Sequence, residues 1–171
     1  MANYNFRKDL TEGERGEEVV RAELEEEGAT FNGDNKNNKY DISMTMPNGR
    51  EMKFEIKTDV WCYPPKRVIT DHGIAEEGGR DSGNIFLEFE CRGKASGIMV
   101  SEAEIFVYYF PFFNEIWYIS FEKLMNIIKT QNLRETSWSG DEGSNTKGYL
   151  LPREYYRAHF KVKNTEYKWE R

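Results

Sequence analysis

Three carboxylates and one lysine in the first third of the chain have the types and spacing to bind a cation: Glu17, Asp41, Glu55 and Lys57. Carboxylate oxygens are the ligands that hard divalent cations such as Mg²⁺ prefer, and a lysine beside them supplies a compact, mobile positive charge. Three carboxylates gathered without a cation are unfavourable, because like charges disfavour ionisation. We therefore expect a site built from these residues to bind metal readily or to hold a carboxyl group with a raised pKa.

Asp41, Glu55 and Lys57 lie on a stretch in which apolar and polar residues alternate on both sides of a turn. The apolar positions are Tyr40, Ile42, Met44 and Met46 before the turn and Met52, Phe54 and Ile56 after it. Period-2 alternation around Pro47-Asn48-Gly49 predicts an antiparallel hairpin. We expect its apolar face to be buried and its polar face to carry Asp41, Glu55 and Lys57 together.

Matching apolar residues across the turn predicts how the two strands pair. Met46 then lies opposite Met52, Met44 opposite Phe54, Ile42 opposite Ile56, Asp41 opposite Lys57, and Ser43 opposite Glu55. Asp41 and Glu55 become diagonal neighbours about 7–8 Å apart at Cα, within reach of one cation with ligand bonds of about 2.0–2.1 Å. The ordinary alternative is a charged, solvated hairpin face, on which Lys57 and Asp41 form a weak ion pair.

The element that has to deliver Glu17 is a helix predicted between Thr11 and Gly28. Thr11 with Glu14 forms a capping-box signature, and Gly28 is a typical C-terminal stop. At about 100° per residue, Glu17 falls on the stripe of Val20 and Leu24, whereas Glu18 falls on a solvated face. Gly16 allows close packing or the close approach of a ligand beside Glu17.

The rest of the chain alternates between predicted strands and long loops. Residues 85–92 and 116–119 read as strands, 104–110 as a buried central strand, and 121–130 as a helix capped by Ser120. Residues 29–39, 60–84 and 134–148 are predicted loops, and 155–162 is compatible with either helix or strand. The polar face of 85–92 carries Glu88 and Glu90, either of which could lie beside the hairpin.

Basic residues near aromatic ones are candidates for contact with a nucleic acid. Lys66 and Arg67 lie close to Trp61 and Tyr63, a mixture that suits phosphate contacts and base stacking, and Lys94 lies in a later turn. An ordinary surface loop explains the same residues equally well.

Composition bounds the class of protein. The chain has 171 residues, which predicts one domain spanning 1–171. Its net charge of −6 argues against a protein that holds nucleic acid by bulk charge alone. No run approaches the ~20 apolar residues of a membrane span. Residues 1–10 are a polar lead-in without a secretory signal, so a cytoplasmic location is expected. The two cysteines and two histidines form no zinc pattern.

The order of a helix with Glu17, a strand with Asp41, and a strand with Glu55-Ile56-Lys57 resembles the PD-(D/E)XK nuclease superfamily. The later stretch GNIFLEFECRGKASGI followed by SEAEIFVYYF resembles phage-type and Holliday-junction-resolvase-like members. The resemblance implies an α/β fold with a restriction-endonuclease-like core, a central mixed β-sheet flanked by helices in the order αβββαβ. Tyr40 stands where many members have proline, a common departure.

The resemblance also implies a chemistry and a cellular setting. Glu17, Asp41 and Glu55 are the expected ligands of Mg²⁺, for which Mn²⁺ can substitute, together with the backbone carbonyl of Ile56. Lys57 would orient the attacking water or stabilise the charge that develops on phosphate. The implied activity is hydrolysis of DNA phosphodiester bonds by an endonuclease, on duplex or branched DNA. Such members act as homodimers, and a phage-encoded one would act in the host cytoplasm.

Two other functions remain open at this point. A nuclease-like fold without catalysis would serve as a nucleic-acid or protein-binding module, as the negative net charge suggests. An RNA-directed nuclease would use the same residues on a different substrate. Nothing in the sequence resembles a separate sequence-reading module such as a helix-turn-helix or a zinc finger.

Overall fold

A six-stranded mixed sheet forms the centre of the computed structural model, which describes residues 11–34, 37, 39–138 and 145–170. Its strands are β1 (Thr30–Asp34), β2 (Ile42–Thr45), β3 (Glu51–Thr58), β8 (Ile105–Phe110), β9 (Glu115–Ser120) and β12 (Lys161–Asn164), in the order β1-β2-β3-β8-β9-β12. Only β3 and β8 are parallel; every other neighbouring pair in this sheet is antiparallel. The polar lead-in expected at 1–10 lies outside the described residues.

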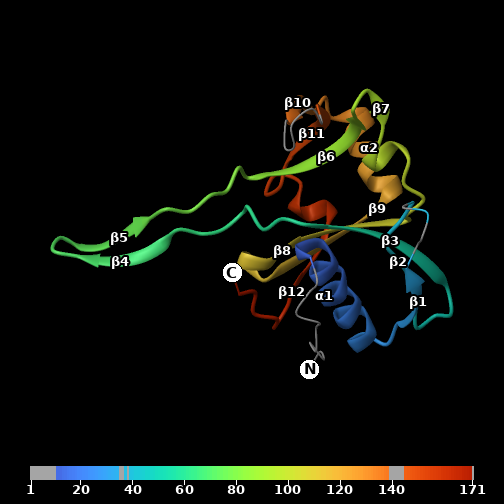
Figure 1. Cartoon of the computed structure of the whole chain (residues 1–171), viewed down its shortest axis with the longest axis horizontal. Coiled ribbons are helices and arrows are strands. Elements are labelled where there is room, and N and C mark those ends of the chain that lie inside the picture. Colours follow the sequence, from blue (N-terminus) through green and yellow to red (C-terminus); the bar gives the residue numbers. More distant parts are fainter. Residues whose placement is uncertain (1–10, 35–36, 38, 139–144, 171) are drawn as a thin grey trace.

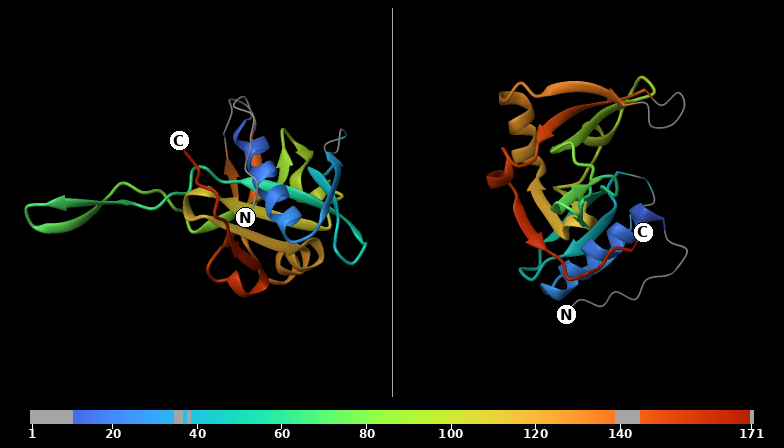
Figure 2. Two further views of the ribbon diagram at one scale, coloured as in Figure 1. Left: turned by 90° about the horizontal axis from the view of Figure 1, so that it is seen from below. Right: turned by 90° about the vertical axis from the view of Figure 1, so that its left-hand side faces the viewer.

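Two further β-structures flank this sheet (Figure 1). One is a four-stranded sheet of β10 (Arg134–Trp138), β11 (Thr146–Pro152), β6 (Asn84–Cys91) and β7 (Lys94–Ala95), in that order. The other is a hairpin of β4 (Lys66–Thr70) and β5 (Gly73–Glu77), which projects from the body as a long arm in Figure 1 and in the left view of Figure 2. The helices are α1 (Glu12–Glu26) and α2 (Phe121–Thr130), with 3₁₀ turns at Gly97–Met99, Pro111–Phe113 and Arg157–His159.

The α/β class with a mixed central sheet is confirmed, but several predicted loops are wrong. The Asn-rich stretch after α1 contains β1, the segment 60–84 contains the arm, and the segment 134–148 begins with β10. Residues 59–104 are all described, and they contain no α-helix between β3 and β8, where the order αβββαβ requires one. The arm, β6 and β7 occupy that connection, and α2 follows β9 instead. Neither described helix is long and apolar enough to cross a membrane.

α1 forms as its caps predict. The Thr11 side chain accepts the Glu14 N–H, and Glu14 accepts the Thr11 N–H at 2.8 Å, which completes the capping box. Gly28 ends the helix region with a φ of +94°, a conformation that glycine adopts without strain. The buried face carries Val19, Val20 and Leu24.

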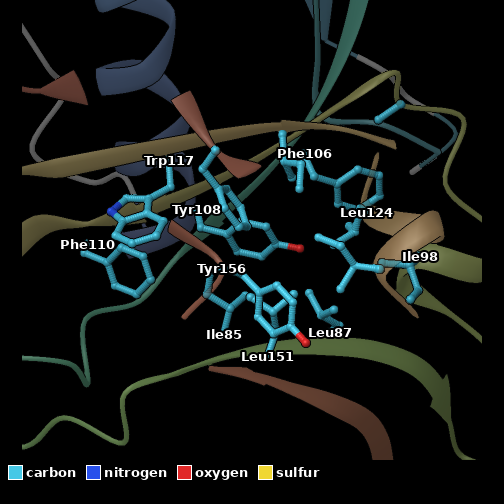
Figure 3. Close-up of a cluster of buried hydrophobic side chains, with 14 of the residues drawn as sticks. Ile85, Leu87, Ile98, Phe106, Tyr108, Phe110, Trp117, Leu124, Leu151 and Tyr156 are labelled. Carbon is cyan, nitrogen blue, oxygen red and sulfur yellow. The ribbon is translucent and has the colours of Figure 1, made fainter. Parts of the chain in front are cut away.

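The core consists of two layers on opposite faces of the main sheet. One layer joins α1 to the apolar face of the β2–β3 hairpin, which confirms the predicted burial of Ile42, Met44, Phe54 and Ile56. Tyr40, predicted on the same face, packs against the other layer instead. The other joins the sheet to α2 and to the four-stranded sheet, and Figure 3 shows its side chains. Strand β8 supplies both layers, with Val107 and Tyr109 on the α1 side and Phe106, Tyr108 and Phe110 on the other. β8 is therefore the central, doubly covered strand that its apolar run predicts.

Gly16 sets how closely α1 approaches the end of β3. A Cβ atom at this position would overlap the side chain of Thr58, whereas a Cβ on Gly13 would meet nothing within 4 Å. The function of Gly16 is thus close packing of the helix on the strand. This packing brings the next residue, Glu17, to the end of β3 that carries Lys57.

The two glycines of α1 give a matched test of this packing. We expect Gly16→Ala to destabilise the fold by about 1–3 kcal/mol, the usual cost of overpacking. Gly13→Ala should instead be neutral or stabilise by up to about 1 kcal/mol, because alanine is the better helix former. Urea unfolding of the two variants measures the difference; equal effects would show that α1 does not depend on close contact with Thr58.

Candidate functional site

The four residues singled out by spacing come together at one edge of the β2–β3 hairpin. Asp41 immediately precedes β2, Glu55 and Lys57 lie on β3, and Glu17 reaches in from α1. Lys57 Nζ lies 2.6 Å from Glu55 Oε1. The charges of Asp41 and Lys57 shift the pKa of Glu17, and the charges of Glu55 and Lys57 shift the pKa of Asp41. The structure therefore gathers all three carboxylates and the lysine into a single electrostatic cluster.

The predicted pairing of the hairpin is wrong by two residues. Ile42 lies opposite Phe54, Ser43 opposite Lys53, and Met44 opposite Met52. The turn explains the shift: the Met46 N–H donates to the Arg50 carbonyl at 2.8 Å, so only Pro47, Asn48 and Gly49 form the loop. Gly49, with a φ of +82°, makes this short loop possible. Because a shift of two keeps every side chain on its face, the predicted faces survive although the pairing does not.

Regular pairing stops at Asp41, and this places its carboxylate beside Glu55. The Asp41 N–H donates to the Phe54 carbonyl at 2.9 Å, and Asp41 Oδ2 accepts the Ile56 N–H at 2.6 Å. Asp41 thus contacts the residues on both sides of Glu55, where the predicted pairing made it face Lys57. When Asp41 is ionised, the hydrogen bond from the Ile56 N–H to its carboxylate is charge-assisted and therefore strong.

Glu55 is held in a buried setting that the sequence did not reveal. Its residue is only 8% exposed, so the predicted open polar face is covered here. The Ser101 hydroxyl lies 3.4 Å from Glu55 Oε2. Burial and the charge of Glu55 raise the pKa of the Tyr108 hydroxyl far above its usual value. Ser101 and Tyr108 come from a distant part of the chain, and no local pattern marks either of them.

Burial and mutual repulsion disturb the ionisation of the cluster. Desolvation, then the charges of Asp41, Asp34 and Glu14, raises the pKa of Glu17 from 4.5 to about 7, with Lys57 opposing the shift. Desolvation and the charge of Glu55 also raise the pKa of Asp41, although the Ile56 N–H and Lys57 act against them. The expectation that crowded carboxylates have a raised pKa is met at these two positions.

Lys57 is the counter-charge of this cluster. Its side chain is 54% exposed, and it bridges the buried Glu55 to solvent. Partial burial opposes its charge, but Glu55, Asp41 and Glu88 outweigh that effect and raise its pKa. Lys57 therefore remains a full cation at neutral pH.

Of the two acidic residues on β6, Glu88 lies beside the cluster. Its charge helps to raise the pKa of Lys57. The side chains of Glu88, Lys57 and Asp59 line a cavity of about 210 Å³ between β3 and β6. Glu90 instead forms an ion pair with Lys147 at 2.7 Å. The site thus has a second wall, contributed by the four-stranded sheet.

The three basic residues proposed as substrate contacts lie elsewhere. Lys66 and Arg67 are on the arm, where Arg67 Nε lies 3.9 Å from Glu76, and Lys94 is on the short strand β7. Within the part of the chain that the structure describes, no hydrogen bond or ion pair joins any of the three to the four-residue cluster.

The donors of the cluster suit a hard cation in their chemistry. Glu17, Asp41 and Glu55 offer only carboxylate oxygens, the type that Mg²⁺ prefers. Across residues 11–34, 37, 39–138 and 145–170, no three His, Cys, Asp or Glu side chains are already close enough to ligate one ion. A cation would therefore require the carboxylates to converge and Lys57 to release Glu55.

The raised pKa of Glu17 predicts a pH-dependent stability difference. Above pH 7 Glu17 is ionised in both states, so the folded state alone carries the cost of burying this charge and of its repulsion by neighbouring carboxylates. Between pH 7 and 4.5 the folded state takes up the proton first and recovers that stability. Glu17→Gln should therefore be more stable than the wild type by about 1 kcal/mol above pH 7, after solvent screening, and the difference should vanish below pH 4.5.

Glu18→Gln, one residue along the same helix, is the matched control for loss of a helix charge. Urea unfolding at several pH values measures both variants. A Glu17→Gln difference that stays constant with pH would show that Glu17 is not held near other carboxylates.

Comparisons with known proteins identify no relative of this chain. No family model, no curated protein and no solved structure matches the chain. Any function therefore has to be inferred from the cluster itself.

Proposed function

We propose that the protein is a Mg²⁺-dependent endonuclease of the PD-(D/E)XK type that hydrolyses DNA phosphodiester bonds. The observation that supports this most is the meeting of Glu17, Asp41, Glu55 and Lys57, which come from a helix, a strand end and a second strand. The short spacing between Glu55 and Lys57 is common by chance. Chance explains less easily a fold that also brings Asp41 and a glutamate from a helix beside these two residues.

Each side chain has a role that its surroundings support. Asp41 and Glu55 are the proposed primary ligands, because Asp41 is anchored by the Ile56 N–H and Glu55 is buried beside it. A bound Mg²⁺ would lower the pKa of its water and stabilise negative charge on the phosphate. Glu17, with a pKa of about 7, is about half protonated in the free protein at neutral pH, and binding a cation would favour its ionised form.

Lys57 is the proposed contact to the reacting phosphate. Its side chain is 54% exposed, and its ammonium group lies 2.6 Å from Glu55 Oε1. If Glu55 held a cation, the Lys57 side chain would be available to contact a phosphate oxygen or the attacking water. A compact ammonium on a flexible stem suits this movement better than the rigid guanidinium of arginine.

We propose branched or otherwise structured DNA as the substrate. No element of the described chain forms a helix-turn-helix or zinc-finger reader, so selectivity would depend on backbone shape. RNA is the alternative substrate of the same site. A substrate panel of duplex DNA, four-way junctions, single strands and RNA separates these classes.

A binding module without catalysis is the second candidate. It is favoured by the Lys57–Glu55 ion pair, which already balances the buried carboxylate, and by the net charge of −6. Cation binding and strand cleavage, measured separately, distinguish the two functions.

The first test is Mg²⁺-dependent nicking of the substrate panel. Asp41→Asn, Glu55→Gln and Lys57→Ala should each lower the rate by about 10²–10³, the usual effect of removing a charge-stabilising group. Lys53→Ala, two strand positions nearer the turn from Glu55, is the matched control and should cleave normally. Absence of Mg²⁺- or Mn²⁺-dependent cleavage of every substrate would favour the binding module.

The second test measures the cation without any substrate. Mg²⁺ should raise the melting temperature of the wild type through preferential binding to the folded state, and Asp41→Asn or Glu55→Gln should abolish the rise. Lys57→Ala should keep or strengthen it, because the ammonium group that competes for Glu55 is gone. Equal Mg²⁺ effects on all four proteins would exclude the proposed ligands.

A further inference from the structure

The cavity between β3 and β6 adjoins the cluster, because Lys57 belongs to both. Its volume of about 210 Å³ equals the space of about seven water molecules in the liquid. That is less than the roughly 300 Å³ at which pockets for drug-sized ligands begin, so it suits a single small ring system. The lining is mainly apolar and includes Ile85, Leu87, Ile98, Phe106 and Phe110.

The hydroxyl group of Tyr108 is a buried polar group in this lining. Tyr108 is only 5% exposed and lines the cavity. Figure 3 shows its hydroxyl pointing among apolar side chains. Among the residues that the structure describes, none forms a hydrogen bond with this hydroxyl. Because a buried tyrosine hydroxyl normally has a partner, this one is available to a ligand that brings a polar edge into the cavity.

Three charged side chains, Lys57, Asp59 and Glu88, also line the cavity. Asp59 is occupied by its own turn, since its Oδ1 accepts two backbone N–H groups at 2.9 and 3.0 Å. Glu88 forms no hydrogen bond or ion pair with any described residue. A purely apolar occupant would cover these charges and leave the Tyr108 hydroxyl unpaired, which is unfavourable. The occupant that fits therefore has an apolar face and polar edges.

We propose that the cavity holds one unstacked nucleobase of the DNA strand that the site cleaves. The base lies among the aromatic and aliphatic side chains, while the Tyr108 hydroxyl and the Glu88 carboxylate contact its polar edge. Lys57, at the boundary with the cluster, contacts a phosphate of the same nucleotide. Enzymes that extrude a base hold it by this combination of apolar stacking and hydrogen bonds to its edge. The assignment to a cleaved strand rests on the nuclease activity proposed above.

Glu88 gives the pocket a preference among bases. An ionised carboxylate only accepts hydrogen bonds, so it pairs with the exocyclic amino group of cytosine or adenine. Thymine offers carbonyl oxygens in place of that group. Extruding a base costs least where it is already unpaired, and the pocket thereby favours structured DNA with unpaired bases beside the cleaved bond.

Binding of four small compounds to the full chain tests the pocket: dAMP, dCMP, dTMP and deoxyribose phosphate, which lacks a base. Isothermal titration calorimetry, with and without Mg²⁺, should show dAMP and dCMP binding about tenfold or more tightly than deoxyribose phosphate, the gain expected from stacking one base. The comparison with deoxyribose phosphate removes any contribution of the phosphate or the cation.

Tyr108→Phe keeps the ring and removes the hydroxyl. It should weaken binding of dAMP and dCMP by about fivefold, the effect of one hydrogen bond, and leave deoxyribose phosphate unchanged. Because the hydroxyl has no partner in the free protein, the variant should unfold at a urea concentration equal to or above that of the wild type. Tyr109→Phe, at the next position of β8 but in the layer on the α1 side, is the matched control and should bind as the wild type does.

Glu88→Gln should remove the preference for dCMP over dTMP, because an amide also donates hydrogen bonds. Glu90→Gln, two positions along β6 and paired with Lys147, is its control and should keep the preference.

Three results would overturn the pocket. They are equal binding of all four compounds, no binding of any of them, or a Tyr108→Phe variant that is less stable but binds nucleotides normally. A chain that nicks DNA but gives one of these results keeps its activity and loses the pocket. Base binding that responds to Tyr108→Phe and Glu88→Gln in a chain that never nicks DNA supports the pocket and overturns only the nuclease activity.

Discussion

The burial of neighbouring carboxylates, which both desolvates them and sets their charges against one another, is the constraint on which the candidate site depends. Glu17, Asp41 and Glu55 share one edge of a hairpin, and the raised pKa values of the first two record the cost of that arrangement. Two features offset it: the Ile56 N–H on Asp41 and the ammonium group of Lys57 on Glu55. Clusters of ionisable groups with perturbed pKa values are enriched at functional sites, although structural ion-pair networks produce them as well.

The surrounding fold keeps the carboxylates from moving apart. β3 lies between β2 and the parallel strand β8, and β8 is covered on both faces. Glu55 and Lys57 lie opposite Phe106 and Tyr108 of β8, so their backbone is fixed by a buried neighbour. On the other side, Gly16 allows α1 to approach Thr58 closely and so positions Glu17. The site is therefore set by rigid elements rather than by loops.

The sequence predicted which four side chains come together better than it predicted how their strands pair. Period-2 alternation identifies the hairpin faces because burial imposes the same period, and the helix stripe selects Glu17 by the same reasoning. The predicted pairing differs from the observed one by two residues, because apolar residues still lie opposite apolar residues after such a shift. The three-residue loop that ends at Gly49 sets the observed pairing. Ser101, Tyr108 and Glu88 were missed or left open because long-range contacts have no local signature. The arm was read as a loop because its strands have no core against which to alternate.

The position of the arm connects its surface to the site. The chain enters the arm soon after Asp59, which lies just beyond the end of β3, and leaves it just before β6, which carries Glu88. Lys57 and Glu88 line the same cavity. The strands that form its two walls, β3 and β6, are therefore the strands that precede and follow the arm in the chain. Arg153 ties the returning strand to the core through Asp81 and reaches Cys62 on the leaving strand at 3.4 Å. These contacts fix the base of the arm beside the strand ends that carry Lys57 and Glu88.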